Sequence, residues 1–189
     1  CDAVPHLARG RAQHDKHMSE ALDLLVIGAG ACGLAGAIAA HDAGGSVAIL
    51  ESRDRPGGNS ALSTGSIPGA GSRYQQAAGI TDSPEQMVDD LIRVAGHHDA
   101  DDLTRMVAAE CGALCEWLID DLGARMELIT AYRHIGHSVE RLHAPRSRRG
   151  QDLVDDLLRF VAEREIPIAV GNRAESLLVE DGKIVGAMV

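Results

Sequence analysis

Three closely spaced glycines near the start of the chain constrain its fold more than any other feature. The sequence reads Gly28-Ala-Gly30-Ala-Cys-Gly33, directly after the apolar run Leu24-Leu25-Val26-Ile27. A short uninterrupted apolar run is typical of a buried parallel strand, and the apolar residues after the glycines recur at helical spacing. A second apolar run follows at Val47–Leu50. The pattern predicts a strand, a helix and a parallel strand over residues 24–50.

The positions of the glycines indicate what this unit binds. Gly28 permits a tight turn, Gly30 lets a pyrophosphate approach the main chain, and Gly33 lets the helix pack closely on the strand. The helix N-terminus then offers unpaired N–H groups to the phosphates. Glu51 lies 23 positions after Gly28, where it would accept hydrogen bonds from ribose hydroxyls. The motif predicts a dinucleotide site, and the acidic residue disfavours the 2′-phosphate of NADP.

Two other interpretations of this region are weaker. Residues 24–40 form seventeen positions without a charge, which resembles a signal peptide or a short membrane span. Four glycines interrupt the run, and a spanning helix needs about 20 apolar residues, so we expect no membrane span. A glycine-rich turn that binds nothing is the second alternative. The full succession of strand, glycines, helix, strand and acidic residue argues against it.

Composition excludes further classes. The chain has 18 Lys and Arg against 28 Asp and Glu, a formal net charge of −10, so we expect no nucleic acid as a partner, because such surfaces are basic. Four cysteines without a framework of pairs favour a reducing compartment, and we expect a cytoplasmic protein. No Cys or carboxylate stands at tight ligand spacing from His134, His137 and His143, so we expect loop histidines and no metal site.

Beyond the second strand, helices alternate with segments that lack a period. Residues 52–80 hold six glycines and are predicted to be irregular, as are residues 124–149. Ser83 is expected to cap a helix that begins at Pro84, with Gln86 completing a capping box. A second helix over residues 101–122 is indicated by apolar residues at helical spacing, namely Leu103, Met106, Val107, Leu114, Leu118 and Ile119.

Two cysteines lie on this second helix, and three further elements follow it. Cys111 and Cys115 are four positions apart, and we expect small buried core thiols. Residues 150–163 have a helical pattern, and residues 166–170 are a candidate short strand, which Pro167 would confine to a sheet edge or a strand start. Asp181-Gly182 separates two apolar runs and favours a type I′ hairpin turn, whose two central residues both need positive φ.

Several segments together resemble one protein family. Besides residues 28–33 and Glu51, they are Gly57-Gly58-Asn59-Ser60, Ser63-Thr-Gly65-Ser66, Thr81-Asp82-Ser83-Pro84-Glu85, Arg141-Leu-His143-Ala-Pro145 before Gly150, and Asn172-Arg173-Ala174. With these segments, residues 23–189 resemble the N-terminal, FAD-binding part of fumarate reductase/succinate dehydrogenase-type flavoproteins, which include soluble fumarate reductases and 3-ketosteroid dehydrogenases. The resemblance implies an α/β, Rossmann-type FAD-binding domain with a parallel sheet and a β-hairpin at the C-terminal end, incomplete as it stands.

The resemblance also implies which residues hold the cofactor. The ADP half of FAD would be held by the glycine turn and the second strand end, through Gly28, Gly30, Cys32 (by its main chain), Gly33 and Glu51. The flavin and ribityl side would be lined by Gly58, Asn59, Ser60, Gly65 and Ser66, and Ala174 would contact adenine through its main chain. Membrane-bound members join FAD to a histidine close to position 59. Asn59 cannot form that bond, so we expect FAD to be non-covalent.

The function implied is that of an FAD-dependent oxidoreductase, which transfers hydride between flavin and a carbon–carbon bond next to a carbonyl or carboxylate. A small carboxylate or an enone is the expected substrate class. In that family the catalytic arginine and the substrate-binding histidines follow the point where this chain ends, so we assign no catalytic residue. We expect residues 1–20 to be a disordered extension and residues 21–189 to be the N-terminal portion of a larger flavoprotein. A truncated, inactive nucleotide-binding remnant and an NAD-binding Rossmann domain stay open as alternatives.

Overall fold

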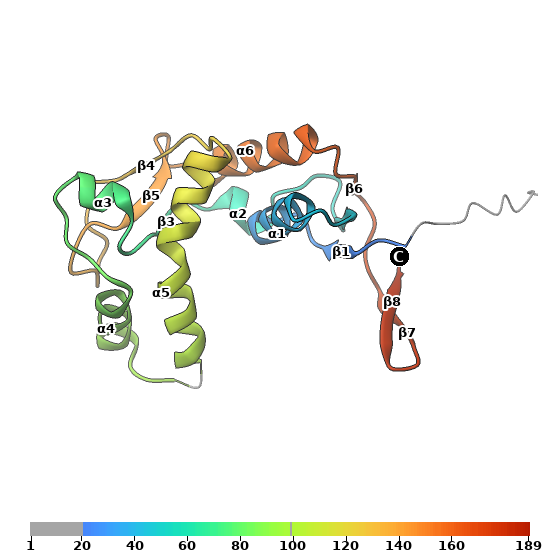
Figure 1. Ribbon diagram of the computed structural model, residues 1–189, viewed down its shortest axis with the longest axis horizontal. Helices are drawn as coiled ribbons and strands as arrows, with labels where there is room; N and C mark the ends of the chain where they lie inside the picture. Colours follow the sequence, from blue (N-terminus) through green and yellow to red (C-terminus); the bar gives the residue numbers. More distant parts are fainter. Residues whose placement is uncertain (1–20, 99) are drawn as a thin grey trace, which may run out of the picture.

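The computed structural model describes residues 21–98 and 100–189 (Figure 1), so the expectation for residues 1–20 lies outside the described residues. Strand β1 (Leu24–Ile27), helix α1 (Ala31–Asp42) and strand β2 (Val47–Leu50) form the predicted unit, and β1 and β2 are parallel. Strand β6 (Ile168–Ala169) pairs with the other edge of β2, also in parallel, which gives the order β1-β2-β6. The short strand expected after Pro167 is therefore confirmed, at an edge of the sheet.

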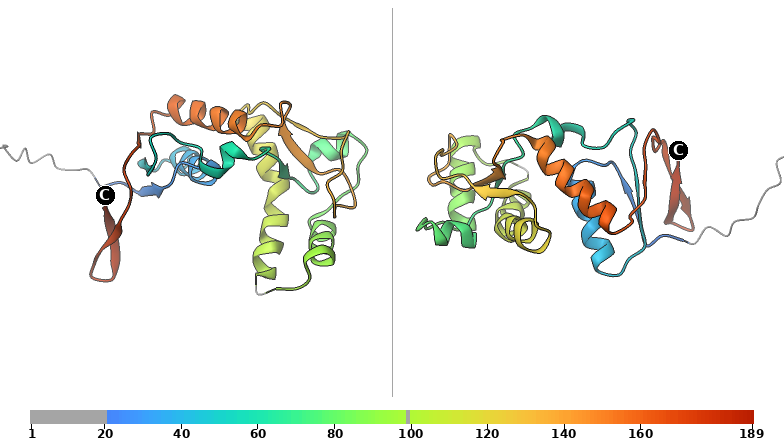
Figure 2. Two further views of the ribbon diagram at one scale, coloured as in Figure 1. Left: turned by 180° about the vertical axis from the view of Figure 1, so that it is seen from behind. Right: turned by 90° about the horizontal axis from the view of Figure 1, so that it is seen from above.

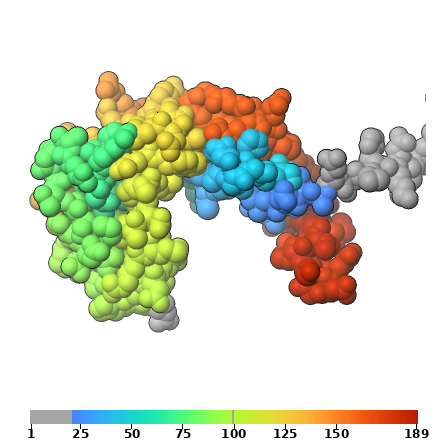
Figure 3. Space-filling model, viewed as in Figure 1, coloured from blue at the N-terminus to red at the C-terminus, as the bar shows by residue number. Residues whose placement is uncertain are grey.

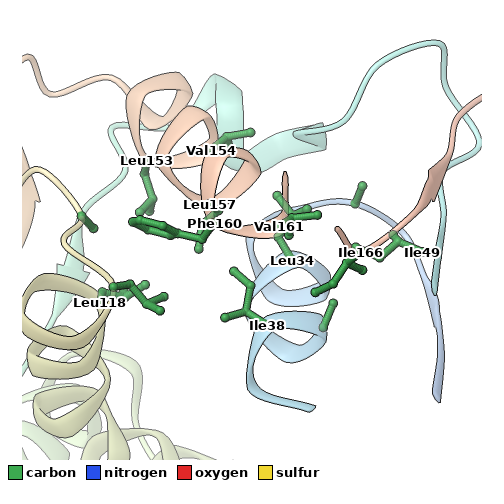
Figure 4. Close-up of a cluster of buried hydrophobic side chains, with 14 of the residues drawn as sticks. Leu34, Ile38, Ile49, Leu118, Leu153, Val154, Leu157, Phe160, Val161 and Ile166 are labelled. Carbon is green, nitrogen blue, oxygen red and sulfur yellow. The ribbon is translucent and has the colours of Figure 1, made fainter. Parts of the chain in front are cut away.

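Helix α6 (Gly150–Glu163) packs against α1. Its apolar side faces Leu34 and Ile38 of α1, with Phe160 and Leu157 between the two helices (Figure 4). Phe160 is the only phenylalanine of the chain, so most of this core is built from aliphatic side chains. Each such side chain contributes about 1.5–3 kcal/mol when it is fully buried. The helix predicted over residues 150–163 and its buried face are confirmed.

A second, antiparallel sheet lies at the other end of α6 (Figure 2). Its order is β3 (Ile67–Pro68), β5 (Leu142–Pro145) and β4 (Met126–Leu128), and helices α2 (Gly58–Leu62) and α3 (Arg73–Ala77) flank β3 along the chain. Most of residues 52–80 and 124–149 are irregular as predicted, but the prediction missed these short helices and strands. Elements of two to five residues are too short to show a period. In addition, β3 and β5 pair with each other although more than fifty positions separate them in the sequence.

Helix α4 (Pro84–Ala95) begins as predicted but is capped differently. Ser83 Oγ accepts the N–H of Gln86 at 3.2 Å. The Gln86 side chain does not return to Ser83, because its Nε2 donates to Ser138 Oγ at 2.7 Å, so the predicted capping box is wrong. A capping box does occur at α3, between Ser72 and Gln75, in a segment that was predicted to be irregular.

Helix α5 (Asp101–Glu116) continues into the π-helix η1 (Trp117–Asp121), which confirms the helix predicted over residues 101–122. Of the apolar residues that indicated this helix, Leu118 in η1 is buried, but the four in α5 are exposed. The buried residues of α5 are Ala108, Cys111, Gly112 and Cys115. The larger apolar side chains are exposed, with values of 53% for Leu103, 56% for Met106, 42% for Val107 and 36% for Leu114. A Cβ on Gly112 would lie 2.4 Å from the Ala70 carbonyl oxygen. Main chain therefore packs directly on the helix, and only its small-residue face allows that approach, which also buries both thiols as expected.

The last element is the hairpin of β7 (Ser176–Glu180) and β8 (Lys183–Met188). Asp181 and Gly182 have φ values of +48° and +75°, which confirms the two positive values that the type I′ turn requires. The hairpin lies at the opposite end of the molecule from α4 and α5, and the surface between these ends is hollowed (Figure 1, Figure 3). The architecture is α/β, as expected. No helix of the described residues is long and apolar enough to cross a membrane.

Candidate functional site

The turn between β1 and α1 needs two of its glycines for reasons internal to the fold. Gly28 has φ of +103°, which side chains rarely permit, and its N–H donates to the Leu50 carbonyl at 2.7 Å. A Cβ on Gly33 would lie 2.0 Å from the Gly28 carbonyl oxygen and 3.1 Å from Val26 Cγ1. The turn and the close packing of helix on strand both follow from these two positions.

Gly30 differs from the other two glycines. It has φ of −78°, an ordinary value for any residue. A Cβ at this position would meet nothing closer than Ser60 Oγ at 3.7 Å and the Gly57 carbonyl at 4.0 Å. Neither backbone strain nor a neighbouring atom therefore requires glycine here. The free space above Gly30 suits a group that approaches the main chain from outside.

Donors for such a group are present around Gly30. The N–H groups of Gly30, Cys32 and Gly33 form no hydrogen bond within the part of the chain that the structure describes. They lie at the N-terminus of a twelve-residue helix with no acidic residue in its first turn. Unpaired N–H groups and the positive end of the helix dipole favour an anion. These residues also line a cavity of about 510 Å³ together with Gly28 and part of β1.

Glu51 lies against the same turn and is only 7% exposed. Its Oε1 accepts the N–H of Arg53 at 2.8 Å, and its Oε2 accepts the N–H of Ala29 at 2.9 Å. The hydrogen bond from Arg53, followed by the one from Ala29, has the largest effect in lowering the pKa of Glu51. The carboxylate is therefore ionised at neutral pH. From its place in the sequence, this carboxylate was expected only to accept hydrogen bonds from ribose. In the structure both oxygens already accept backbone donors, although each oxygen has a second lone pair.

A second cavity, of about 250 Å³, opens beside the carboxyl ends of β1 and β2. Its lining consists of Ile27, Gly28, Leu50, Ser52, Asn172, Arg173 and Ala174. The segment that carries Ala174 is held there because the N–H of Asn172 donates to the Glu51 carbonyl at 2.9 Å. Ala174 and Gly28 of the glycine turn therefore line the same cavity. Ser52 and Arg173 were not singled out as site residues, although each is adjacent in sequence to one that was.

The structure brings only part of the expected flavin-side segment to the turn. The N–H of Ala31 donates to Ser60 Oγ at 3.1 Å, and Gly57 N–H donates to the Ala29 carbonyl at 2.8 Å. Gly65 is instead packed against the start of α6. The remaining members, Gly58, Asn59 and Ser66, form no hydrogen bond to the β1–α1 turn within the described ranges.

The histidines do not converge on this site. His143, expected in a loop, is buried in β5 because that strand pairs on both edges. Its Nδ1 donates to the Arg141 carbonyl at 3.1 Å and its Nε2 lies 3.0 Å from Ser72 Oγ. Burial lowers the pKa of His143, so the ring is neutral and structural. Residues 21–98 and 100–189 contain no group of three or more metal-ligating side chains.

Comparisons with known proteins agree with this geometry. A family model described as an FAD binding domain matches residues 23–189. NADH:fumarate oxidoreductase of Klebsiella pneumoniae (strain 342) is 32% identical over 166 residues, which are 87% of this chain and 18% of that protein. Urocanate reductase of Eggerthella lenta is 30% identical over 187 residues, 97% of this chain and 29% of that protein.

A solved structure shows the same fold. The open conformation of a flavocytochrome c3 fumarate reductase superposes with a TM-score of 0.79 at 30% identity, covering 89% of this chain and 30% of that one. The chain spans less than a third of the length of each of these three proteins.

Proposed function

The chain belongs to the family of FAD binding domains, and on that premise we propose that its β1–α1 turn holds the diphosphate of FAD. The observation that most supports this placement is the set of unpaired N–H groups at Gly30, Cys32 and Gly33 beneath the free space at Gly30. A diphosphate supplies the acceptors that these donors lack, and the glycine leaves room for it.

The rest of the cofactor follows from this placement. The ribose lies toward Glu51, and adenine enters the cavity beside the main chain of Ala174. The ribityl chain and flavin then extend along α2 and the segment after it, past Gly58, Asn59, Ser60, Gly65 and Ser66. The bond from Ala31 to Ser60 supports this path, because it joins the start of that segment to the turn. FAD is held without a covalent bond, since covalent members have a histidine close to the position of Asn59, and Asn59 cannot form that bond.

For the whole protein we infer an FAD-dependent oxidoreductase. Bound FAD supplies hydride transfer to or from a carbon–carbon bond next to a carbonyl or carboxylate. Relatives named for fumarate and urocanate support a small unsaturated carboxylate as the substrate class. The residues of this chain bind and orient the cofactor, and none is assigned a proton-transfer role. A cytoplasmic location stays a prediction.

Gly30→Ala tests the proposal because the protein itself tolerates a Cβ there. We expect the purified chain to bind FAD and quench its fluorescence. Gly30→Ala should weaken binding at least about tenfold while the melting temperature of the cofactor-free protein stays unchanged. Gly186→Ala is the matched control, since a Cβ on Gly186 would meet only Leu178 Cδ1, at an ordinary contact distance of 3.5 Å, and Gly186 lies in β8, outside both cavities. A melting temperature raised by NADH and not by FAD, or no binding of either, would contradict the proposal.

A further inference from the structure

We propose that Glu51 is a positioning residue for the phosphate-binding turn, and that this role is separate from any contact with ribose. The inference deepens the proposed FAD site and rests on it. Glu51 connects two backbone segments, because one carboxylate oxygen accepts Ala29 N–H from the β1–α1 turn and the other accepts Arg53 N–H from the chain after β2. The carboxylate therefore joins the turn to the end of the second strand.

The hydrogen bonds of the turn divide its N–H groups into two sets. Three are held by the protein: Gly28 N–H by the Leu50 carbonyl, Ala29 N–H by Glu51, and Ala31 N–H by Ser60. The N–H of Gly30 lies between two held neighbours and has no partner within the described residues. The peptide unit that carries the Gly30 N–H is itself held, because the Ala29 carbonyl accepts Gly57 N–H at 2.8 Å. Glu51 and Ser60 fix the peptide planes on either side of it, and the three contacts together set the direction of the Gly30 donor. Glu51 is the only charged group among these acceptors.

A carboxylate suits this task better than an amide would. It accepts on both oxygens, whereas a glutamine side chain has one accepting oxygen and an NH₂ group that only donates. Because Glu51 is buried, with 7% of its surface exposed, water has little access to replace a lost acceptor. Glu51→Gln is close in shape, yet its NH₂ group must face the backbone N–H of either Ala29 or Arg53. That N–H loses its acceptor, and two donors then point at each other.

The positioning role has a consequence that ribose binding does not share. A turn that is already ordered needs less fixing when the ligand arrives, which favours binding. Loss of that order weakens every ligand that uses the turn, including one without ribose hydroxyls. If Glu51 acted through the ribose diol alone, a ligand without that diol would bind to Glu51→Gln at least as tightly as to the wild type. Removing a negative charge near the phosphates would, if anything, increase its affinity.

The probes are therefore ADP and 2′,3′-dideoxy-ADP, titrated against the wild-type chain and Glu51→Gln by calorimetry. We expect Glu51→Gln to weaken dideoxy-ADP about fivefold, the equivalent of one hydrogen bond near 1 kcal/mol, and to weaken ADP further. Asp54→Asn is the matched control for charge, because Asp54 is exposed in the same loop and should leave both affinities unchanged. Unchanged or tighter binding of dideoxy-ADP to Glu51→Gln overturns the positioning role.

Amide hydrogen exchange in the ligand-free protein provides a second measurement. We expect Ala29 or Arg53 to exchange at least about fivefold faster in Glu51→Gln and at the wild-type rate in Asp54→Asn. Unchanged exchange at both amides would overturn the inference, whatever the nucleotide does. Failure of the wild-type chain to bind ADP or FAD would instead contradict the proposed cofactor site. A residue that only stabilised the fold would lower the denaturation midpoint without changing the affinity of the folded protein for dideoxy-ADP.

Discussion

Arg141 and Asp82 form an ion pair that solvent does not reach. The Arg141 Nη2 and Nε groups donate to the two carboxylate oxygens at 2.8 and 2.9 Å, and both side chains are 0% exposed. The third donor, Nη1, reaches Asp90 Oδ2 at 2.9 Å. Arg141 directly precedes β5, and its guanidinium thus binds both the residue before the N-cap of α4, Asp82, and Asp90 in the middle of that helix. This contact accounts for the motif residues Asp82 and Arg141.

Removing the charge of Asp82 should be strongly destabilising. Asp82→Asn leaves a buried guanidinium with one of its two partners neutral, and we expect a loss of about 3 kcal/mol in the free energy of unfolding. Urea denaturation measures it. Asp89→Asn is the control, because Asp89 is an exposed residue of α4 and should change the free energy by less than about 0.5 kcal/mol. Equal effects of the two variants would show that the ion pair contributes no stability.

Asp90 should make the protein sensitive to acid. Burial raises the pKa of this carboxyl, but hydrogen bonds from Ser138, Arg93 and Arg141 outweigh burial and hold the pKa well below its usual 3.8. A group with a depressed folded pKa contributes stability that is complete above its unfolded pKa and is lost as the pH falls toward the folded value.

We therefore expect the free energy of unfolding to decline below about pH 4. Asp90→Asn should be less stable at neutral pH and should show a shallower decline, because that carboxyl no longer titrates. Urea denaturation over a pH series is the measurement. Parallel pH profiles for the wild type and Asp90→Asn would assign the acid sensitivity to other carboxylates.

Two glycines of α1 should respond in opposite directions to alanine. Gly33→Ala places a Cβ 2.0 Å from the Gly28 carbonyl, and we expect a loss of about 2 kcal/mol or more, since main chain must move. Gly36→Ala meets nothing within 4 Å and should gain about 1 kcal/mol through helix propensity. Thermal or urea denaturation of the two variants decides the matter, and a stable Gly33→Ala would mean that α1 can shift away from β1.

The cysteines should differ in their reaction with iodoacetamide. Cys32 is exposed in the first turn of α1, whereas burial raises the pKa of Cys115 to about 12 and also raises that of Cys111. Because the thiolate is the reactive form, peptide mapping should show Cys32 modified before Cys111 and Cys115 in the native protein. ADP should slow the modification of Cys32 if the diphosphate lies beside it. Early modification of Cys111 or Cys115 would show that α5 opens readily.

The first crossover unit could be predicted in detail because its determinants are local. Gly28 sets the turn, the apolar runs set the strands, and Leu34 and Ile38 recur on one side of α1. Each element can therefore be recognised from a few neighbouring residues. The same holds for the hairpin turn at Asp181 and Gly182. At the site, this local information was sufficient to identify the glycines and Glu51 as neighbours.

Long-range contacts decided what the sequence alone could not. The buried face of α5 is the small-residue side because main chain at Ala70 approaches Gly112 directly, and no periodicity in the helix records where that partner lies. Likewise, Glu51 was recognisable as an acid at the end of a strand, but its bond to Ala29, 22 positions away, required the ends of β1 and β2 to lie side by side. Sequence determined the elements and the chemical character of the glycine turn, because these depend on residues close together along the chain. Tertiary structure alone determined which donors of that turn are already taken, because hydrogen bonds depend on distances that only packing sets.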